Sequence, residues 1–353
     1  IRIEPKRGYG RFMNLGFKYN LYFLWRLHPT INRLTRIING HDAVVCAPGG
    51  ICMGGFQNWK HIFLLYIAKL CKKPIFYYGR SFGPFPTETK SNRLFKKISF
   101  ELLRYFSFIS IRDAKTQFLA QEEGIKFVPT VDTAFLEMPR VAIPKEILAD
   151  IQDAPYMVFV PNELVWHYAY KKYSIDNIKS FYLSLLYSIR KLFPDLRIVM
   201  LPQTFCYSNA VQNTGKRDVN FFRALAKTAN DDRIVVVQDT YGSDIQQTII
   251  NGAKFVIGAR YHSIVFAINN NVPFISLNYE HKMFGLLESL EKSDCGFDIT
   301  NIFDSPEKIE RLTHKIENRM LRLHDDIECQ QKAKQMSLFS FNEFVLFCKR
   351  PLA

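Results

Sequence analysis

Residues 254–282, KFVIGARYHSIVFAINNNVPFISLNYEHK, contain two predicted β-strands separated by a predicted helix. The apolar runs at 255–257 and 274–277 have the length and composition of buried strands. The apolar run at 264–268 predicts the helix, and the three asparagines at 269–271 end it. A strand, a helix and a second strand in this order are typical of a parallel α/β sheet.

Charged side chains follow both of these strands. Arg260 and His262 come after the first strand, Lys282 comes after the second, and Ser263 is expected to cap the helix. Ligands of open α/β sheets bind at the carboxyl ends of the strands, and a helix N-terminus attracts anions. These residues therefore predict a site for a small, multiply charged anion. The alternative is that Arg260 pairs with a carboxylate and that His262 caps a turn.

The alternation of strands and helices extends over most of the chain. Further strands are predicted at 43–47, 74–78, 108–111, 128–135, 156–160, 197–201 and 234–237. The Pro-rich and charged stretch 137–155 is predicted to link two α/β domains. The expected organisation is an N-terminal Rossmann-like domain (1–145), a C-terminal Rossmann-like domain (154–304) and a helical tail (305–353).

Composition restricts the class of protein. The chain has 353 residues, of which 48% are hydrophobic, so it can form about two packed domains. Seven scattered cysteines without metal-binding spacing argue against a disulfide scaffold and favour a reducing cytoplasm. We see no apolar run of membrane-spanning length and no signal peptide.

The net charge of +14 favours anionic partners, and the basic residues are concentrated at the N-terminus. Residues 1–36 contain one acid, Glu4, and eight basic residues: Arg2, Lys6, Arg7, Arg11, Lys18, Arg26, Arg33 and Arg36. Aromatic residues are interspersed among them, and a helix is expected near 18–28. The segment is either a solvated basic face or a patch that contacts an anionic membrane at its inner face.

Several short motifs resemble the polysaccharide pyruvyl transferase family. The clearest are GARYHS at 258–263, NVP at 271–273, and the pair Tyr279 and Lys282. A glycine-rich stretch at 42–55, GRSFGP at 79–84, SIRD at 110–113, Asp132 and LPQ at 201–203 also match in order. The resemblance covers roughly residues 42–290. It implies a GT-B-like fold of two Rossmann-like domains, with the tail crossing back to the first domain.

The resemblance also implies an activity. Members of the family transfer the enolpyruvyl group of phosphoenolpyruvate to a sugar of a polysaccharide precursor, which forms a pyruvate ketal and releases phosphate. The phosphoenolpyruvate-binding residues it implies are Arg112, Arg260, His262, Ser263 and Lys282. Among these, His262 is the candidate acid or base, and Arg260 and Lys282 would stabilise the departing phosphate.

The acceptor is expected to be a sugar or a lipid-linked oligosaccharide. Candidate acceptor-binding residues are Gly49, Gly50, Arg80, Asn162, Glu163, Trp166 and His167. Aromatic rings can stack on sugar faces, and Asn or Glu can bind hydroxyls. The loop with Trp166 and His167 has packing between domains as its alternative role, and the glycines have a plain tight turn as theirs.

We expect no cofactor and no metal, because no clear set of metal ligands is present. Two other functions stay open. The same cations on the same fold could bind the diphosphate of a nucleotide sugar in a glycosyltransferase. A basic protein that binds membranes or nucleic acid is the second alternative, but no nucleic-acid motif is visible and the cations follow separate strands, so nucleic acid is not an expected partner.

Overall fold

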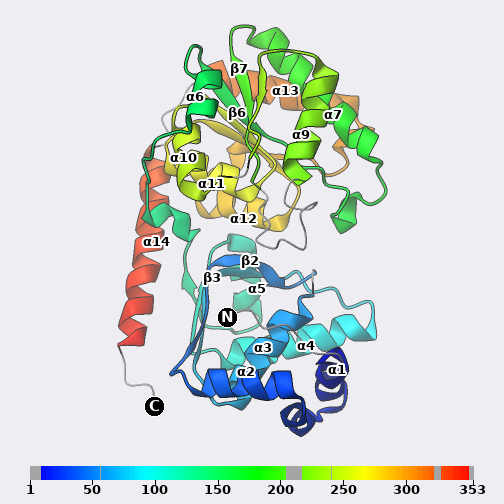
Figure 1. Ribbon diagram of the computed structural model, residues 1–353, viewed down its shortest axis with the longest axis vertical. Helices are drawn as coiled ribbons and strands as arrows, with labels where there is room; N and C mark the ends of the chain where they lie inside the picture. The colour runs from blue at the N-terminus through cyan, green and yellow to red at the C-terminus, as the bar shows by residue number, and fades with distance from the viewer. Residues whose placement is uncertain (1–8, 56, 204–216, 240, 322–326, 350–353) are drawn as a thin grey trace. The chain divides into compact units, whose positions relative to one another are not determined.

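The computed structural model describes residues 9–55, 57–203, 217–239, 241–321 and 327–349 (Figure 1). The chain forms two compact units, Ile1–Thr133 with Met336–Ala353 (unit 1), and Ala134–Gln335 (unit 2). The division lies upstream of the stretch 137–155, which contains the short helix α6 (Lys145–Ile151). The domain limits inferred from the sequence remain a prediction. Residues 204–216, a polar stretch of the sequence, lie outside the described residues.

Unit 1 is built on a five-stranded sheet in which every described pairing is parallel. Its strands are β1 (Val44–Cys46), β2 (Gly49–Met53), β3 (Ile75–Phe82), β4 (Phe108–Ile111) and β5 (Val128–Pro129), in the order β1-β3-β4-β5 with β2 also paired to β3. Its helical elements are α1 (Tyr9–Tyr19), η1 (Tyr22–Leu27), α2 (Pro29–Asn39), α3 (Trp59–Leu70), α4 (Lys90–Tyr105) and α5 (Ala114–Glu122).

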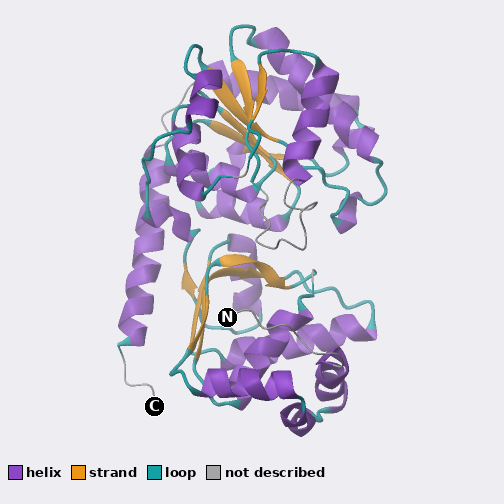
Figure 2. Ribbon diagram, in the orientation of Figure 1, coloured by secondary structure: helices purple, strands orange, loops and turns teal. Residues whose placement is uncertain are grey.

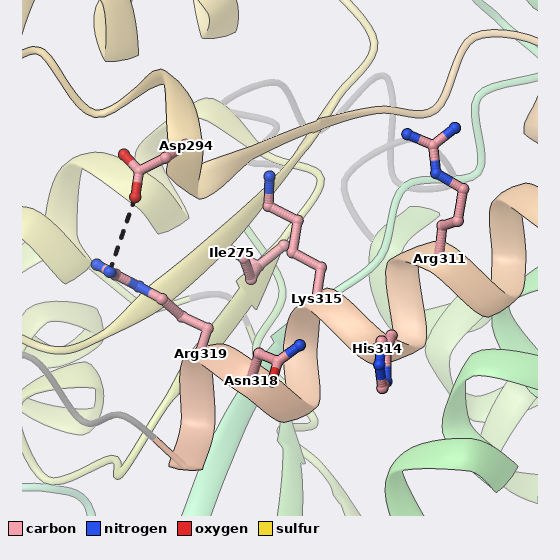
Figure 3. Close-up of a pocket in the computed structure, with 7 residues that line it drawn as sticks. All are labelled: Ile275, Asp294, Arg311, His314, Lys315, Asn318 and Arg319. Atoms are coloured by element: carbon pink, nitrogen blue, oxygen red, sulfur yellow. Dashed lines mark ion pairs between the residues drawn. The ribbon is translucent and has the colours of Figure 1, made fainter.

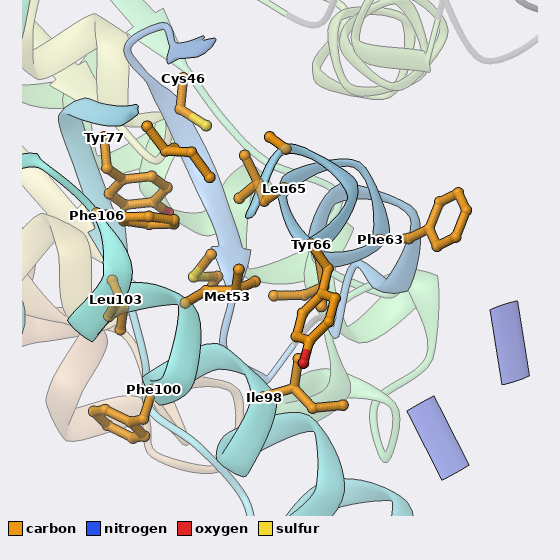
Figure 4. Close-up of a cluster of buried hydrophobic side chains, with 14 of the residues drawn as sticks. Cys46, Met53, Phe63, Leu65, Tyr66, Tyr77, Ile98, Phe100, Leu103 and Phe106 are labelled. Carbon is orange, nitrogen blue, oxygen red and sulfur yellow. The ribbon is translucent and has the colours of Figure 1, made fainter. Parts of the chain in front are cut away.

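The core of unit 1 lies between β3 and the helices α3 and α4 (Figure 4). All eight residues of β3 are buried, which fits a central strand covered on both faces. Phe63 and Tyr66 of α3 and Leu103 of α4 are also buried in this cluster. A fully buried side chain of this size contributes about 1.5–3 kcal/mol through removal of apolar surface from water.

Unit 2 is built on a six-stranded sheet in the order β11-β10-β9-β6-β7-β8, again with every described pairing parallel. Helices cover both faces of this sheet (Figure 2). Its strands are β6 (Tyr156–Val160), β7 (Arg197–Met200), β8 (Ile234–Val236), β9 (Val256–Gly258), β10 (Phe274–Asn278) and β11 (Gly296–Asp298). Its longer helices are α7 (Ile175–Leu192), α9 (Arg217–Ala229), α10 (Ser243–Asn251), α11 (Tyr261–Asn269), α12 (His281–Ser289) and α13 (Pro306–Leu321), and its shorter elements are η2 (Thr133–Leu136), η3 (Tyr168–Tyr170), η5 (Ser293–Cys295) and η6 (Ile302–Asp304).

The C-terminal helix α14 (Ile327–Cys348) begins in unit 2 and ends in unit 1, as the expected tail does. Its last turns pack on the unit 1 sheet. The ring of Phe344 stacks on Tyr78 at 4.9 Å between centroids, and Phe347 meets Phe76 edge-on at 5.6 Å. The hydroxyl of Ser337 donates a hydrogen bond of 2.8 Å to the carbonyl of Asp132. The predicted crossing of the tail to the first domain is thus confirmed.

Four local predictions were wrong. Residues 49–53, where the glycine-rich stretch was expected to form a loop, form strand β2. The strand expected at 128–135 is limited to β5, and the 3₁₀ helix η2 already begins at Thr133. The helix expected near 18–28 is divided, because α1 ends at Tyr19 and η1 begins at Tyr22, with Asn20 at φ 57° between them. Ser263 does not cap α11, because Arg260 occupies the N-cap position and the helix already begins at Tyr261. None of the helices in the described residues is long and apolar enough to cross a membrane.

Candidate functional site

The predicted charged residues of unit 2 lie at one edge of its sheet. Strand β9 pairs with β6 on one side and with β10 on the other, so the carboxyl ends of the three strands are neighbours. Asn162 follows β6, Arg260 follows β9, and Glu280 follows β10. This is the edge at which open α/β sheets bind ligands.

Arg260 is the N-cap residue of α11 and has extended backbone torsion angles (φ −118°, ψ 136°). Its side chain, which is 16% exposed, forms an ion pair through Nη2 with Oδ1 of Asp218 from α9. Oδ2 of Asp218 accepts a hydrogen bond of 3.1 Å from the backbone N–H of Gln203. Asp218 therefore connects the end of β7 with the guanidinium at the end of β9.

The charge on Arg260 is secured by this pairing. Burial opposes a charged guanidinium, but the carboxylate of Asp218 reverses this effect, and the net result is a raised pKa for Arg260. Within the described residues, Arg260 Nε and both amide atoms of Gln203 are buried and form no hydrogen bond. A buried N–H donor of a charged group without a partner is costly, so these atoms point to a polar ligand at this edge.

Two further residues of the predicted site differ in their access to solvent. His262, in the first turn of α11, is exposed, and its ring stacks on Phe266 with 5.7 Å between centroids. Ser263 is fully buried, and its hydroxyl donates to the carbonyl of Arg260 at 2.5 Å. A Cβ atom on Gly258 would lie 2.0 Å from the Ser263 hydroxyl oxygen, so this close packing requires glycine at position 258.

Lys282 and Glu280 form a second charged group at the edge, after β10. Glu280 is the N-cap residue of α12, and its Oε2 lies 2.8 Å from Lys282 Nζ. Its Oε1 lies 3.6 Å from Nε2 of His167, which is almost fully buried. Burial lowers the pKa of His167, only partly offset by Glu280, and its Nδ1 accepts a hydrogen bond from Ala169 N. His167 is therefore held as a neutral imidazole, with Nε2 directed at the carboxylate.

The remaining acceptor candidates of unit 2 form an aromatic loop above β6. Asn162 is fully buried; its amide donates to Ala259 O at 3.4 Å and accepts from Trp166 Nε1 at 3.2 Å. The Trp166 ring meets Tyr279 edge-on at 6.2 Å. Glu163 lies in the same loop and is partly exposed. Asn162 thus orients Trp166, whereas Trp166 and Glu163 keep surface that a ligand can reach.

Arg112, a predicted phosphoenolpyruvate ligand, belongs to unit 1. It follows β4, is 3% exposed, and its Nη1 forms an ion pair with Oδ2 of Asp132. Its Nε donates to Ser81 Oγ at 3.4 Å. Asp113, the next residue, caps α5 by accepting from Thr116 N at 2.9 Å. The Arg-Asp motif therefore connects the ends of β4 and β5 and begins a helix.

The other candidates of unit 1 lie on neighbouring strands. Arg80 was expected just beyond the end of the strand at 74–78, but β3 continues to Phe82, so Arg80 lies within the strand. There it is buried and donates to Ala47 O at 2.6 Å. Gly49 and Gly50 lie in β2, and a Cβ on Gly49 would lie 3.2 Å from Arg80 Nη1. His61 of α3 is close to this guanidinium. Burial and the charge of Arg80 lower the pKa of His61 to about 4.

A separate cavity of about 470 Å³ in unit 2 contains none of the predicted site residues. Arg311, Lys315 and Arg319 line it at four-residue intervals along α13 (Figure 3). Lys315 donates to Gly296 O at 2.9 Å, and Arg319 lies 3.9 Å from Asp294. These two contacts attach α13 to the segment around β11. Lys315 and Arg319 therefore have a structural role. In the described residues, no group of three His, Cys, Asp or Glu side chains could hold a metal ion.

Three residues at the strand-end edge of unit 2 were not among the predicted site residues. Asp218 and Glu280 are the carboxylates that hold Arg260 and Lys282, and Gln203 presents its amide beside them. The LPQ motif at 201–203 was the available signal for Gln203. Nothing in the sequence indicates the pairing of Asp218 with Arg260, because 42 positions separate them.

The chain contains two Rossmann-like units, each built on a parallel sheet, as proteins of the GT-B type do. Solved structures share this fold. One is a UDP-N-acetylglucosamine 2-epimerase from Listeria monocytogenes, described as putative, with a TM-score of 0.53 and 12% sequence identity. The matched region covers 89% of this chain and 77% of the epimerase chain. An α,α-trehalose-phosphate synthase (UDP-forming) from Burkholderia vietnamiensis has a TM-score of 0.54 and 10% identity, with coverage of 98% and 87%. At such low identity these likenesses establish the fold alone.

The chain belongs to the polysaccharide pyruvyl transferase family, whose model matches residues 4–281. The match begins well before residue 42, so the basic N-terminal segment is part of the family region. Among curated proteins, the amylovoran biosynthesis protein AmsJ of Erwinia amylovora is 24% identical over 335 residues, which are 86% of this chain and 71% of the relative. Both findings support a transferase of polysaccharide biosynthesis.

Proposed function

We propose that the protein transfers the enolpyruvyl group of phosphoenolpyruvate to a sugar of a cell-surface polysaccharide precursor and closes a pyruvate ketal. The observation that carries this proposal is Arg260, a charged guanidinium at a strand end whose Nε has no hydrogen-bond partner in the described residues. It lies at the N-terminus of α11, where backbone N–H groups add positive potential. The family to which the chain belongs supports the reaction class.

The donor has the charges that this edge would bind. Phosphoenolpyruvate carries a carboxylate and a phosphate, and an arginine can bind either one through two parallel hydrogen bonds. In the proposed complex, Arg260 binds one anionic group of the donor. Lys282, which is paired with Glu280 in this structure, turns part of its interaction to the other anionic group. Arg112 remains a proposed donor ligand from unit 1, and Ser263 supports the backbone of Arg260.

The reaction needs two hydroxyl groups and balances without a cofactor. The first hydroxyl adds to the carbon that carries the phosphate, and its proton is matched by one delivered to the methylene carbon, which becomes a methyl group. The second hydroxyl displaces phosphate from the same carbon, and its proton leaves with the phosphate. We assign the proton transfers to His262, which is exposed at the edge and has an imidazole suited to both directions.

The proposed acceptor is a sugar, free or attached to a lipid. Trp166 and Glu163 offer a ring and a carboxylate at the same edge of unit 2. Asn162 and His167 are placed to hold this loop in shape, and Arg80, Gly49 and Gly50 are the corresponding candidates in unit 1. Reaction at the inner face of a membrane would fit a lipid-linked acceptor.

The experiment is incubation with phosphoenolpyruvate and a panel of acceptors that contain galactose, mannose or N-acetylmannosamine. We expect phosphate release that depends on the acceptor, and a product with a new methyl signal in its proton NMR spectrum. Parallel incubations with UDP- and GDP-sugars test the glycosyltransferase alternative. Binding and turnover of a nucleotide sugar, with no response to phosphoenolpyruvate, would overturn the proposal.

A further inference from the structure

The N-terminal layer, defined here as α1, η1 and α2, carries basic residues without acidic ones. Residues 9–41 contain no Asp or Glu, and their five cations are all exposed: Arg11, Lys18, Arg26, Arg33 and Arg36. Within the described residues these cations form no ion pair of 4.0 Å or less. Such uncompensated charge favours an anionic partner.

The same layer exposes large apolar side chains. Tyr19, Phe23 and Leu27 are 57%, 67% and 70% exposed. The backbone beneath them is firmly packed, because the Trp25 ring between Phe23 and Leu27 is buried and its Nε1 donates to Phe12 O at 2.6 Å. Apolar tips beside exposed cations, on a fixed element, are typical of surfaces that lie in a membrane interface.

A cavity of about 790 Å³ lies between α1 of this layer and the neighbouring helices α3 and α4. Its walls include Leu15, Phe17, Trp59 and Leu94, and basic side chains of the same cavity come from Arg11, Lys18 and Lys90. The Phe17 ring packs edge-on against Trp25 and Tyr66, with 5.2 Å and 5.4 Å between ring centroids. An apolar space with cations beside it is complementary to a hydrocarbon chain that ends in a phosphate.

We propose that the N-terminal layer docks on a bilayer that contains anionic phospholipid, with one lipid chain in this cavity. The lipid phosphate contacts Arg11, Lys18 and Lys90, while Phe23 and Leu27 enter the interface. A soluble polyanion would pair with the basic side chains, but it would leave the apolar walls of the cavity and the side chains of Phe23 and Leu27 in contact with water. The inference concerns unit 1 alone and does not depend on the proposed reaction, so either can fail without the other.

The first experiment is flotation of the full chain with vesicles of phosphatidylcholine, alone or mixed with phosphatidylglycerol. The wild type should float only with the mixed vesicles. The triple variant Arg11→Gln/Lys18→Gln/Lys90→Gln should lose at least tenfold in partition. A control of equal charge change, Lys171→Gln/Lys191→Gln/Lys227→Gln, replaces exposed cations of unit 2 and should float as the wild type does. Equal loss in both triple variants would reduce the effect to net charge and overturn the proposal.

The second experiment asks whether a chain enters the cavity. Lipids brominated in their acyl chains quench a tryptophan that they contact, and Trp59 lines the cavity. Wild-type fluorescence should be quenched by mixed vesicles that contain such lipids, and Trp59→Phe should lose that part of the quenching. The variant Phe23→Ser/Leu27→Ser should bind the mixed vesicles more weakly than the wild type. Salt should release it more readily, because its remaining attraction to the vesicles is electrostatic. Identical quenching in wild type and Trp59→Phe would show that the cavity stays empty and would refute the lipid site.

Discussion

The guanidinium of Arg260 is held by the carboxylate of Asp218, a residue of α9 that is 42 positions earlier in the chain and 2% exposed. This ion pair gives Arg260 two roles at once, in the fold and in the proposed donor site. A substitution of Arg260 leaves a buried carboxylate without its partner. Loss of binding in such a variant has to be separated from loss of stability.

We therefore predict that Arg260→Ala abolishes phosphoenolpyruvate binding and also lowers the free energy of unfolding, by about 3–5 kcal/mol for a broken buried pair. The double variant Arg260→Ala/Asp218→Asn should recover part of the stability, because the orphaned charge is removed, but none of the binding. Calorimetric titration and chemical denaturation measure the two effects. Donor binding that returns in the double variant would assign Arg260 to the fold only.

His262 and Lys282 are predicted to act on different kinetic quantities. His262→Gln should lower turnover by about 10²–10⁴-fold with little change in phosphoenolpyruvate affinity, because it removes proton transfer. Lys282→Ala should weaken that affinity, because it removes a point charge that now lies 2.8 Å from Glu280. Turnover and donor binding are compared for both variants. Near-normal turnover in His262→Gln would move the proton transfer to another residue, with Glu280, His281 and His167 tested next.

His61 is predicted to make unit 1 sensitive to acid. Its pKa is about 4 in the fold, below the ordinary value near 6.5, because burial and Arg80 disfavour the imidazolium. Above pH 6.5 the imidazole is neutral in both the folded and the unfolded chain, and the full stability of the fold is present. As the pH falls from there towards 4, the unfolded chain binds the proton before the folded one does, and the fold loses stability. The loss is up to about 3 kcal/mol.

Denaturation curves at pH 7 and pH 4.5 test this prediction. The wild type should lose more stability between these two values than His61→Gln, which cannot become protonated. His314→Gln is the matched control, because it also removes a histidine but from a side chain of unit 2 that is 75% exposed. Equal pH dependence in the wild type and His61→Gln would contradict the assigned protonation state.

Gly16 is predicted to be essential to the packing of η1 on α1. A Cβ at this position would lie 2.3 Å from the Trp25 ring, so the indole would have to move. Gly16→Ala should lower the free energy of unfolding by about 1–3 kcal/mol, as overpacking does. Gly10→Ala, on the same helix and with nothing within 4 Å, should be neutral or slightly stabilising. Equal effects of the two substitutions would show that Trp25 does not restrict this position.

Much of the fold followed from local sequence. A buried parallel strand appears in the sequence as a short apolar run. The strands predicted at 156–160 and 274–277 therefore agree with β6 and β10 to within one residue. Residues that follow such strands lie at one edge because the strands are parallel, which brought Arg260 and Lys282 to the same edge from sequence alone. The tail at 305–353 was expected to be helical and to return to the first domain, as α14 does.

Only the tertiary structure decided which groups hold the site. The partners of Arg260 and Lys282, the burial of Asn162 and Ser263, and the position of Arg80 inside β3 all depend on contacts between segments distant in sequence. Local patterns report burial and periodicity, because these act on each residue through its immediate neighbours. Charge pairing depends on where separate strands and helices meet. For this reason the sequence identified the edge and its cations, whereas the carboxylates that fix them appeared only in the folded chain.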